Sequence, residues 1–324
     1  MKVTILGTGA YAIALANMLS YNNNDITLWS KFEEEINYIK SNNKIKALPN
    51  IEIKNNYKYT TDMKDSINNS NLIILAIPAF AVNDVCIDLS KYYKDYMHIC
   101  IATKGIEQNT GYFMSNIITK HIKTNNIAVI SGGTFATDMF DNPLIGLTLA
   151  TKNKETEKII KQSLESNHLK LKVTKDILGI ELCGAIKNVF AIASGILDGL
   201  GYSTSTNSMF IVESLISIKN IITSLNGNED TIISYAGIGD LLLTCNSPKS
   251  RNYTLGKLIG LNTSKEEIDN YLKNTTIEGL YTLKSIYMLL KEKNIDIPLI
   301  NVIYDIIYNN KDSIYLIKYI TEKE

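Results

Sequence analysis

The feature that most constrains the fold is the opening segment KVTILGTGAYAIALA, in which an apolar run leads into a glycine-rich turn and then into residues with helical spacing. Gly7 permits a tight turn, Gly9 lets the backbone approach a pyrophosphate, and Ala12 is small enough for the helix to pack on the strand. Amides at a helix start, together with the helix dipole, favour a bound diphosphate. The segment therefore predicts a dinucleotide-binding βαβ unit.

The rest of the first half alternates between buried strands and amphipathic helices. Strand-like apolar runs lie at Val3–Leu6, Ile26–Trp29, Leu72–Ile77, Met97–Ala102, Ile127–Ile130, Leu144–Ala150 and Leu169–Val173, and helical patterns at Ala10–Ser20, Phe32–Lys40 and Lys154–Ser166. This alternation indicates right-handed βαβ units in an α/β, doubly wound parallel sheet of the Rossmann type. The Asn- and Lys-rich stretch 41–71 predicts loops and short elements.

The pattern changes after Asp176, where helical stretches replace strands. They cover 176–199, 207–225, 229–236, 239–244, 251–260, 264–272, 278–293 and 298–307. We expect a dinucleotide-binding Rossmann domain over residues 1–178 and an all-α substrate and catalytic domain over residues 179–324.

Composition excludes several classes of protein. The net charge of the 324 residues is zero, which removes the basic field that generic nucleic-acid binding needs. The four cysteines show no CxxC spacing and the three histidines no HxxxH pair, so no metal site is expected. The longest apolar tract, Val189–Leu197, is shorter than the roughly 20 residues of a membrane span, and no signal peptide is visible. We expect a cytoplasmic protein without membrane insertion.

The residues after the second strand bear on the choice of cofactor. An Asp or Glu there would bind the adenosine ribose 2′-hydroxyl, but Ser30 and Lys31 occupy the position. Lys31 could attract a 2′-phosphate, and Glu33, Glu34 and Glu35 are expected along a solvated helix face. Both NAD and NADP therefore remain open as cofactors.

Two later strand ends should face the same ligand crevice, since ligands of open α/β sheets bind outside the carboxyl ends of the strands. Pro78 lies in AIPAF and Lys104 in ATKG. A lysine at such an edge can contact a phosphate or a carbonyl oxygen.

Lys187 and Asn188 interrupt an otherwise apolar helix, ELCGAIKNVFAIASGILDGLGY. Small residues at helical spacing lie near Lys187, namely Gly184, Ala191, Ser194 and Gly195. This stripe leaves room either for a ligand or for close approach of another backbone. The alternative for Lys187 is a side chain that extends out of a buried helix to solvent.

A second polar group lies in GIGDLLLTCNSPKSRNYTLG. Asp240 opens a helix with Thr244 one turn later, and the alternative role for Asp240 is an N-cap. Ser250 and Asn252 flank Arg251, whose fork of donors suits a phosphate.

Taken in order, several segments resemble the bacterial-type NAD(P)-dependent glycerol-3-phosphate dehydrogenases over nearly the whole chain. They are GTGAYA, LW, AIP, ATKG, SGGTFA, ELCGAIKNV, GIGDLLLTC, SRN and IEG. The resemblance implies an oxidoreductase that interconverts sn-glycerol 3-phosphate and dihydroxyacetone phosphate, supplying glycerol 3-phosphate for phospholipid synthesis. We also expect a homodimer.

The resemblance implies roles for individual residues, with Lys187 as the proton acceptor. The predicted catalytic residues are Lys187, Asp240 and Lys104. The predicted substrate-binding residues are Lys104, Gly132, Thr134, Lys187, Asn188, Asp240, Thr244, Ser250, Arg251 and Asn252. The predicted cofactor-binding residues are Gly7, Gly9, Ala10, Tyr11, Ala12, Ser30, Lys31, Pro78, Lys104, Ala136, Arg251, Thr276 and Glu278.

The chain departs from the family pattern at a few positions. Gly133 replaces the usual proline of SGPTFA, Ala10 stands where serine is common, and Ala12 replaces the usual third glycine. The segment YSTSTNSMFIVES lacks the usual arginine. None of these changes touches Lys187 or Asp240.

Two other functions remain possible from the sequence. A ketopantoate-reductase-like or hydroxyacid dehydrogenase would also join a Rossmann domain to a helical domain and use a Lys-Asn pair. A non-catalytic NAD-binding sensor would leave the coincidence of Lys187, Asn188 and Asp240 without a reason.

Overall fold

The computed structural model describes residues 1–54, 56–108, 110–141 and 143–322. The chain forms two compact units, one made of Met1–Lys104 and Met114–Ile177, the other of Gly105–Phe113 and Leu178–Glu324. The sequence predicts Gly105–Phe113 in the first domain. The structure places this segment in the second unit, because Ile106 and Phe113 are buried in the helical core there.

The first unit alternates strands and helices as the sequence predicts. Its elements are β1 (Lys2–Leu6), α1 (Ala10–Ser20), β2 (Asp25–Trp29), α2 (Glu33–Asn42), β3 (Lys58–Thr60), α3 (Met63–Ile67), β4 (Leu72–Leu75), η1 (Ala79–Ala81), α4 (Val82–Ser90), β5 (His98–Ile101), α5 (Met114–His121), β6 (Ile127–Ser131), η2 (Ala136–Met139), β7 (Ile145–Thr151), α6 (Lys154–Leu164) and β8 (Leu169–Thr174).

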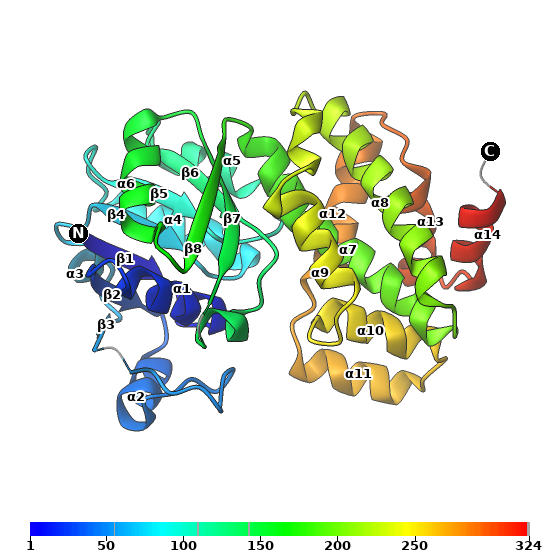
Figure 1. Ribbon diagram of the computed structural model, residues 1–324, viewed down its shortest axis with the longest axis horizontal. Helices are drawn as coiled ribbons and strands as arrows, with labels where there is room; N and C mark the ends of the chain where they lie inside the picture. Colours follow the sequence, from blue (N-terminus) through cyan, green and yellow to red (C-terminus); the bar gives the residue numbers. More distant parts are fainter. Residues whose placement is uncertain (55, 109, 142, 323–324) are drawn as a thin grey trace. The chain divides into compact units, whose positions relative to one another are not determined.

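These strands form one sheet in the order β3-β2-β1-β4-β5-β6-β7-β8. Helices α1 and α6 pack on one face, and α3, α4 and α5 on the other (Figure 1). The arrangement confirms the predicted Rossmann-type, doubly wound architecture. All four residues of β4 are buried, as its uninterrupted apolar run predicts for a strand covered on both faces.

The predicted parallel sheet has one antiparallel pair that the sequence did not indicate, since β7 pairs antiparallel to β6. Strand β8 pairs parallel to β7, so both run against the other six strands. A parallel neighbour needs a long crossover, usually through a helix. In the described part of the β6–β7 connection the only helical element is the short η2.

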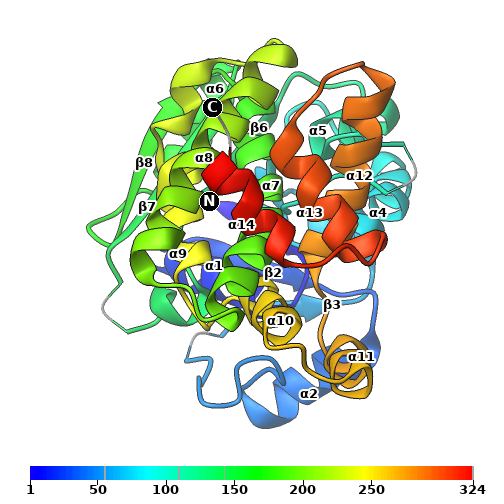
Figure 2. The ribbon, with the colours of Figure 1, turned by 90° about the vertical axis from the view of Figure 1, so that its right-hand side faces the viewer.

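The second unit is helical. Its elements are α7 (Ile177–Gly199), α8 (Thr204–Ser224), η3 (Glu229–Ile232), η4 (Tyr235–Gly239), α9 (Asp240–Cys245), α10 (Arg251–Gly260), α11 (Lys265–Asn274), α12 (Glu278–Glu292), α13 (Pro298–Tyr308) and α14 (Ile314–Glu322). Helices α8, α13 and α14 pack together, and α12 packs on α13 (Figure 2). The predicted helix over 229–236 is instead a 3-10 turn followed by a π-helical turn, and α14 was not predicted.

Helix α7 is the core of this unit and is buried continuously from Gly179 to Leu197. By length and composition alone it could cross a membrane, but 83% of its most apolar window is buried inside the protein. The apolar tract Val189–Leu197 is shorter than the buried part of this helix. Lys187 and Asn188 interrupt the apolar sequence, but both side chains are buried.

Helices α7 and α10 touch through their main chains. A side chain at Gly195 or Gly256 would collide with a backbone carbonyl of the other helix, and the same holds for Gly199 and Gly260 one turn further along. Of the two possibilities that the small-residue stripe leaves open, close approach of another backbone is thus correct at Gly195. The contacts advance together along both helices, so the start of α10 lies beside the earlier part of α7.

Gly256→Ala should therefore destabilise the protein even though alanine is the better helix former. The added methyl group would overlap the carbonyl oxygen of Ile192, which as backbone cannot move aside alone. Overpacking of this kind costs about 1–3 kcal/mol, occasionally more. A lower midpoint in urea unfolding would measure it. Gly239→Ala is the control, because its methyl group would lie 3.5 Å from the nearest atom, an ordinary contact. Equal stability of the two variants would contradict a fixed helix contact.

Candidate active site

The parallel strands of the first unit bring five predicted residues to one edge of the sheet. Each of them follows the carboxyl end of a strand. They are Gly7 after β1, Ser30 after β2, Pro78 after β4, Lys104 after β5 and Gly132 after β6. Because these strands run in one direction, their carboxyl ends meet at the same edge, which is where ligands of open α/β sheets bind.

The glycine turn between β1 and α1 has the geometry of a phosphate cradle. Gly7 has a φ of +129°, and a side chain there would collide with the carbonyl oxygen of Ala76. Gly9 is the N-cap of α1 without a side-chain cap, and a Cβ added to it would meet nothing within 4 Å. Gly7 thus serves the turn itself, whereas Gly9 faces open space at a helix N-terminus.

The other predicted residues of this unit surround the turn or the sheet edge. Ala10 and Tyr11 form the first turn of α1, Ala12 is fully buried, and Lys31 is exposed. Lys104 Nζ donates a hydrogen bond to the carbonyl oxygen of Gly132 at 3.2 Å. Two more lie in the connection that follows β6, with Thr134 Oγ1 donating to the Phe135 carbonyl oxygen and Ala136 opening η2.

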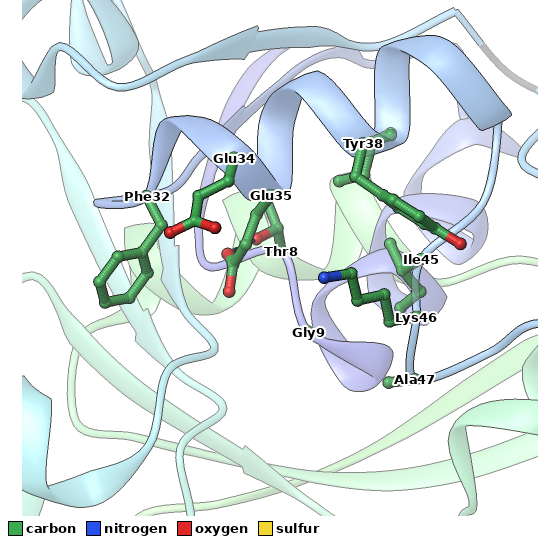
Figure 3. A pocket seen from close by; sticks show the side chains of 10 residues that line it. Thr8, Gly9, Phe32, Glu34, Glu35, Tyr38, Ile45, Lys46 and Ala47 are labelled. Carbon is green, nitrogen blue, oxygen red and sulfur yellow. Dashed lines mark hydrogen bonds between the residues drawn. The ribbon is translucent and has the colours of Figure 1, made fainter.

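A pocket of about 440 Å³ adjoins the glycine turn, between Thr8 and Gly9 on one side and α2 with the segment Ile45–Ala47 on the other (Figure 3). The carboxylate of Glu35 enters its wall, where Oε2 accepts hydrogen bonds from Thr8 Oγ1 and Ser30 Oγ, each at 2.6 Å. Glu35 is exposed, as expected for a solvated helix face, but the expectation missed its two hydrogen bonds. Sequence reasoning missed them because the fold, not the sequence position, returns this side chain to the end of β2.

In the second unit, Lys187 lies in a buried polar cluster. Its Nζ donates to Asp240 Oδ1 at 2.5 Å and to Thr244 Oγ1 at 3.0 Å. The side chain of Lys187 is 11% exposed and that of Asp240 is 0% exposed. The alternative of a lysine extending to solvent is thus excluded, because the amine ends on two buried partners. Burial raises the pKa of the neighbouring Cys245 thiol, which keeps it protonated.

A backbone kink positions Asp240. Gly237 has non-helical φ and ψ values of −83° and −109° inside η4, and a side chain there would collide with the Ile232 carbonyl oxygen. Asp240 then begins α9, and Thr244 Oγ1 donates to the Asp240 carbonyl oxygen at 2.6 Å. The short helix therefore presents the carboxylate and the hydroxyl to Lys187 together.

The remaining predicted residues of this unit lie at the starts of α10 and α12. Asn188 Nδ2 donates to Glu278 Oε2 at 3.4 Å, and Gly279 N donates to Asn252 Oδ1 at 2.9 Å. Ser250 caps α10 by accepting from Tyr253 N. The other two, Arg251 at the first position of α10 and Thr276 before α12, are exposed.

These features together define a class of protein. A Rossmann-type unit with an open glycine turn, joined in one chain to a helical unit with a buried Lys–Asp–Thr cluster, is the organisation of a dinucleotide-dependent oxidoreductase.

The family is shown by comparison with known proteins. The N-terminal domain of NAD-dependent glycerol-3-phosphate dehydrogenases matches residues 2–157, and the C-terminal domain of the same family matches residues 176–318. The chain belongs to this family and is an oxidoreductase that uses NAD(P).

Individual relatives and a solved structure are similar to this chain over nearly its whole length. Glycerol-3-phosphate dehydrogenase [NAD(P)+] of Fusobacterium nucleatum is 31% identical, over 97% of this chain and 94% of that protein. The enzyme of the same description from Staphylococcus haemolyticus is 30% identical, over 97% and 96%. The crystal structure of glycerol-3-phosphate dehydrogenase from Coxiella burnetii superposes with a TM-score of 0.92 at 27% identity, over 99% of each chain.

A ketopantoate reductase from Ralstonia eutropha JMP134 superposes less closely. Its TM-score is 0.61 at 10% identity, over 94% of this chain and 97% of that one. This likeness shows a shared fold and nothing more.

Proposed function

We propose that the protein interconverts sn-glycerol 3-phosphate and dihydroxyacetone phosphate in the cytoplasm, as a homodimer, and so supplies glycerol 3-phosphate for phospholipid synthesis. The observation that carries the proposal is the buried cluster of Lys187, Asp240 and Thr244, in the unit that matches the family's C-terminal domain. Such a cluster can hold and move one proton at a defined point.

The residues of the first unit fit a nicotinamide dinucleotide. Gly9 leaves space where the main chain would meet a pyrophosphate, α1 begins there without a side-chain cap, and the neighbouring pocket is of ligand size. When bound, the cofactor supplies the hydride chemistry. The protein contributes alignment of the reactants and placement of charge.

Proton transfer falls to Lys187. When dihydroxyacetone phosphate is reduced, the C2 carbon gains a hydride and the carbonyl oxygen gains a proton, which the Lys187 ammonium donates. The resulting amine is reprotonated from solvent, and the reverse reaction runs these steps backwards. Asp240 and Thr244 position Nζ, because both accept hydrogen bonds from it.

Phosphate binding falls to Arg251. Its guanidinium is exposed at the start of α10, where helix-end amides also favour an anion. Asn252, beside it, is held by its hydrogen bond with Gly279. The roles of Lys104, Gly132 and Thr134 in substrate binding, and of Ala136, Thr276 and Glu278 in cofactor binding, stay predictions.

Replacing Arg251 should weaken phosphate binding without disturbing the fold, since the side chain is exposed. Arg251→Ala should raise KM for dihydroxyacetone phosphate by an amount corresponding to about 1.5–3 kcal/mol, the range for hydrogen bonds to charged groups. Arg251→Lys should lose less, because it keeps the charge but not the planar fork. Steady-state kinetics measure both.

Dihydroxyacetone, which lacks the phosphate, is the control substrate. Wild type and Arg251→Ala should turn it over about equally poorly. Equal losses on both substrates would assign Arg251 to the cofactor or to the structure instead.

The overall proposal is tested by following oxidation of NADH and of NADPH with dihydroxyacetone phosphate. Ketopantoate in place of the phosphate substrate tests the alternative reductase. Binding of a dinucleotide without turnover of any of these substrates would favour the sensor.

A further inference from the structure

The pocket beside the glycine turn contains a carboxylate that the sequence did not assign to any role. Glu35 lies in the first turn of α2, and its Oε2 accepts hydrogen bonds from a hydroxyl of the glycine turn and from a hydroxyl at the end of β2, both at 2.6 Å. Hydrogen bonds of this length are typical of a hydroxyl donating to a carboxylate. The two bonds fix the side chain where β1 and β2 end.

The donors are themselves well positioned. Thr8 is 6% exposed and Ser30 is 4% exposed, so neither hydroxyl can turn freely to solvent. Ser30 Oγ also accepts a hydrogen bond from Phe32 N at 3.2 Å. Each hydroxyl has one hydrogen, and both hydrogens are donated to Glu35. The Ser30 hydroxyl therefore cannot donate to a cofactor while this arrangement holds.

The other carboxylate oxygen of Glu35 keeps its acceptor capacity. In the described part of the chain, Oε1 makes no hydrogen bond, and the side chain lines the pocket next to Gly9 (Figure 3). A ribose 2′-hydroxyl can donate to such an oxygen, whereas a 2′-phosphate can only repel it.

We propose that Glu35, presented by Thr8 and Ser30, reads the adenosine ribose and makes this enzyme prefer NAD(H) over NADP(H). The inference rests on the proposed use of a nicotinamide cofactor. It adds to that function a residue that recognises the adenosine ribose. The position directly after β2, where a carboxylate would usually do this, holds Ser30 and Lys31 instead.

Two cations near the site act in the opposite direction. Lys31 is exposed, and Lys46 lines the pocket with its Nζ 5.5 Å from the centre of the Tyr38 ring. Neither forms an ion pair with Glu35 in the described residues. Glu35 is held by two buried hydroxyls, whereas both lysines have long side chains that lose entropy when they are ordered. Glu35 is itself exposed, but its two hydrogen bonds restrict its position more than that of either lysine, which favours the carboxylate in the site.

The test measures equilibrium binding rather than turnover. Titration calorimetry of the whole protein with NADH and NADPH gives a selectivity ratio, and competition by 5′-AMP and adenosine 2′,5′-bisphosphate isolates the adenosine end. Wild type should bind NADH on the order of tenfold or more tightly than NADPH, since like charges across a site oppose association. Glu35→Gln should bring the ratio close to one, mainly by improving NADPH binding.

Glu34→Gln is the matched control. Glu34 lines the same pocket from the same helical turn, but it makes no hydrogen bond in the described part of the chain. This variant should keep most of the selectivity. If Glu35→Gln proves unstable, Ser30→Ala removes one donor, keeps the charge, and should lower the ratio by a smaller factor.

The possible results test the preference for NAD(H) separately from the proposed cofactor site. Equal or tighter binding of NADPH by wild type would overturn the inference alone, and so would equal effects of the two Glu→Gln variants. Absence of binding by both dinucleotides would overturn the proposed cofactor site and the inference together.

Discussion

Lys187→Met should lower turnover of dihydroxyacetone phosphate by about 10²–10⁴-fold, the usual contribution of a general acid–base group. Affinity for NADH should change little, because the glycine turn lies in the other unit. The variant should also be less stable, since Asp240 is fully buried and loses its ion-pair partner. Breaking a buried pair costs roughly 3–5 kcal/mol. Kinetics, NADH titration and urea unfolding measure the three effects.

The double variant Lys187→Met, Asp240→Asn separates chemistry from stability. Removing both charges should restore much of the stability but none of the turnover. Near-normal turnover by either variant would remove Lys187 from the mechanism, whatever its effect on folding.

Gly9→Val should abolish tight dinucleotide binding while the protein stays folded. The valine side chain would project into the space that now holds no atom within 4 Å, where the pyrophosphate is expected. Loss of one or two amide–phosphate hydrogen bonds, at about 1.5–3 kcal/mol each, corresponds to at least a tenfold to hundredfold weaker affinity. NADH fluorescence titration measures it.

Gly7→Ala is the contrasting variant. Its methyl group would meet the Ala76 carbonyl oxygen at a backbone conformation that favours glycine, so the unfolding midpoint itself should fall. Unchanged NADH affinity in Gly9→Val would refute the pyrophosphate assignment.

Much of the fold could be predicted because buried strands and helices differ in apolar spacing. Helices α4 and α5 were missed although their buried residues have helical spacing. Two other missed elements carry a weaker signal. β3 has three residues, none of them buried, within an Asn-rich stretch, and α14 buries only Leu316 and Ile320. The reversal at β7 was also missed, because an apolar run of a buried strand carries no information on its direction.

Part of the candidate site could be predicted, because some functional residues differ in polarity from their neighbours in the sequence. Lys187 and Asp240 stand out as polar residues in apolar helices, and the structure joins them. Glu35 did not stand out, because three successive glutamates in a first helical turn resemble a solvated face. Its contacts depend on how α2 packs against the ends of β1 and β2, which only the folded chain shows.

The main-chain contact between α7 and α10 fixes the spacing of the two helices that carry Lys187 and Arg251. Lys187 precedes Gly195 on α7, and Arg251 precedes Gly256 on α10, with both glycines in contact with backbone of the other helix. No side-chain rotamer can therefore alter the spacing of the two helices. If Arg251 holds the phosphate, as proposed, the distance from the phosphate to the reacting carbon is set by backbone contacts between the two helices. Selectivity for substrate length would then survive changes to most side chains in the unit.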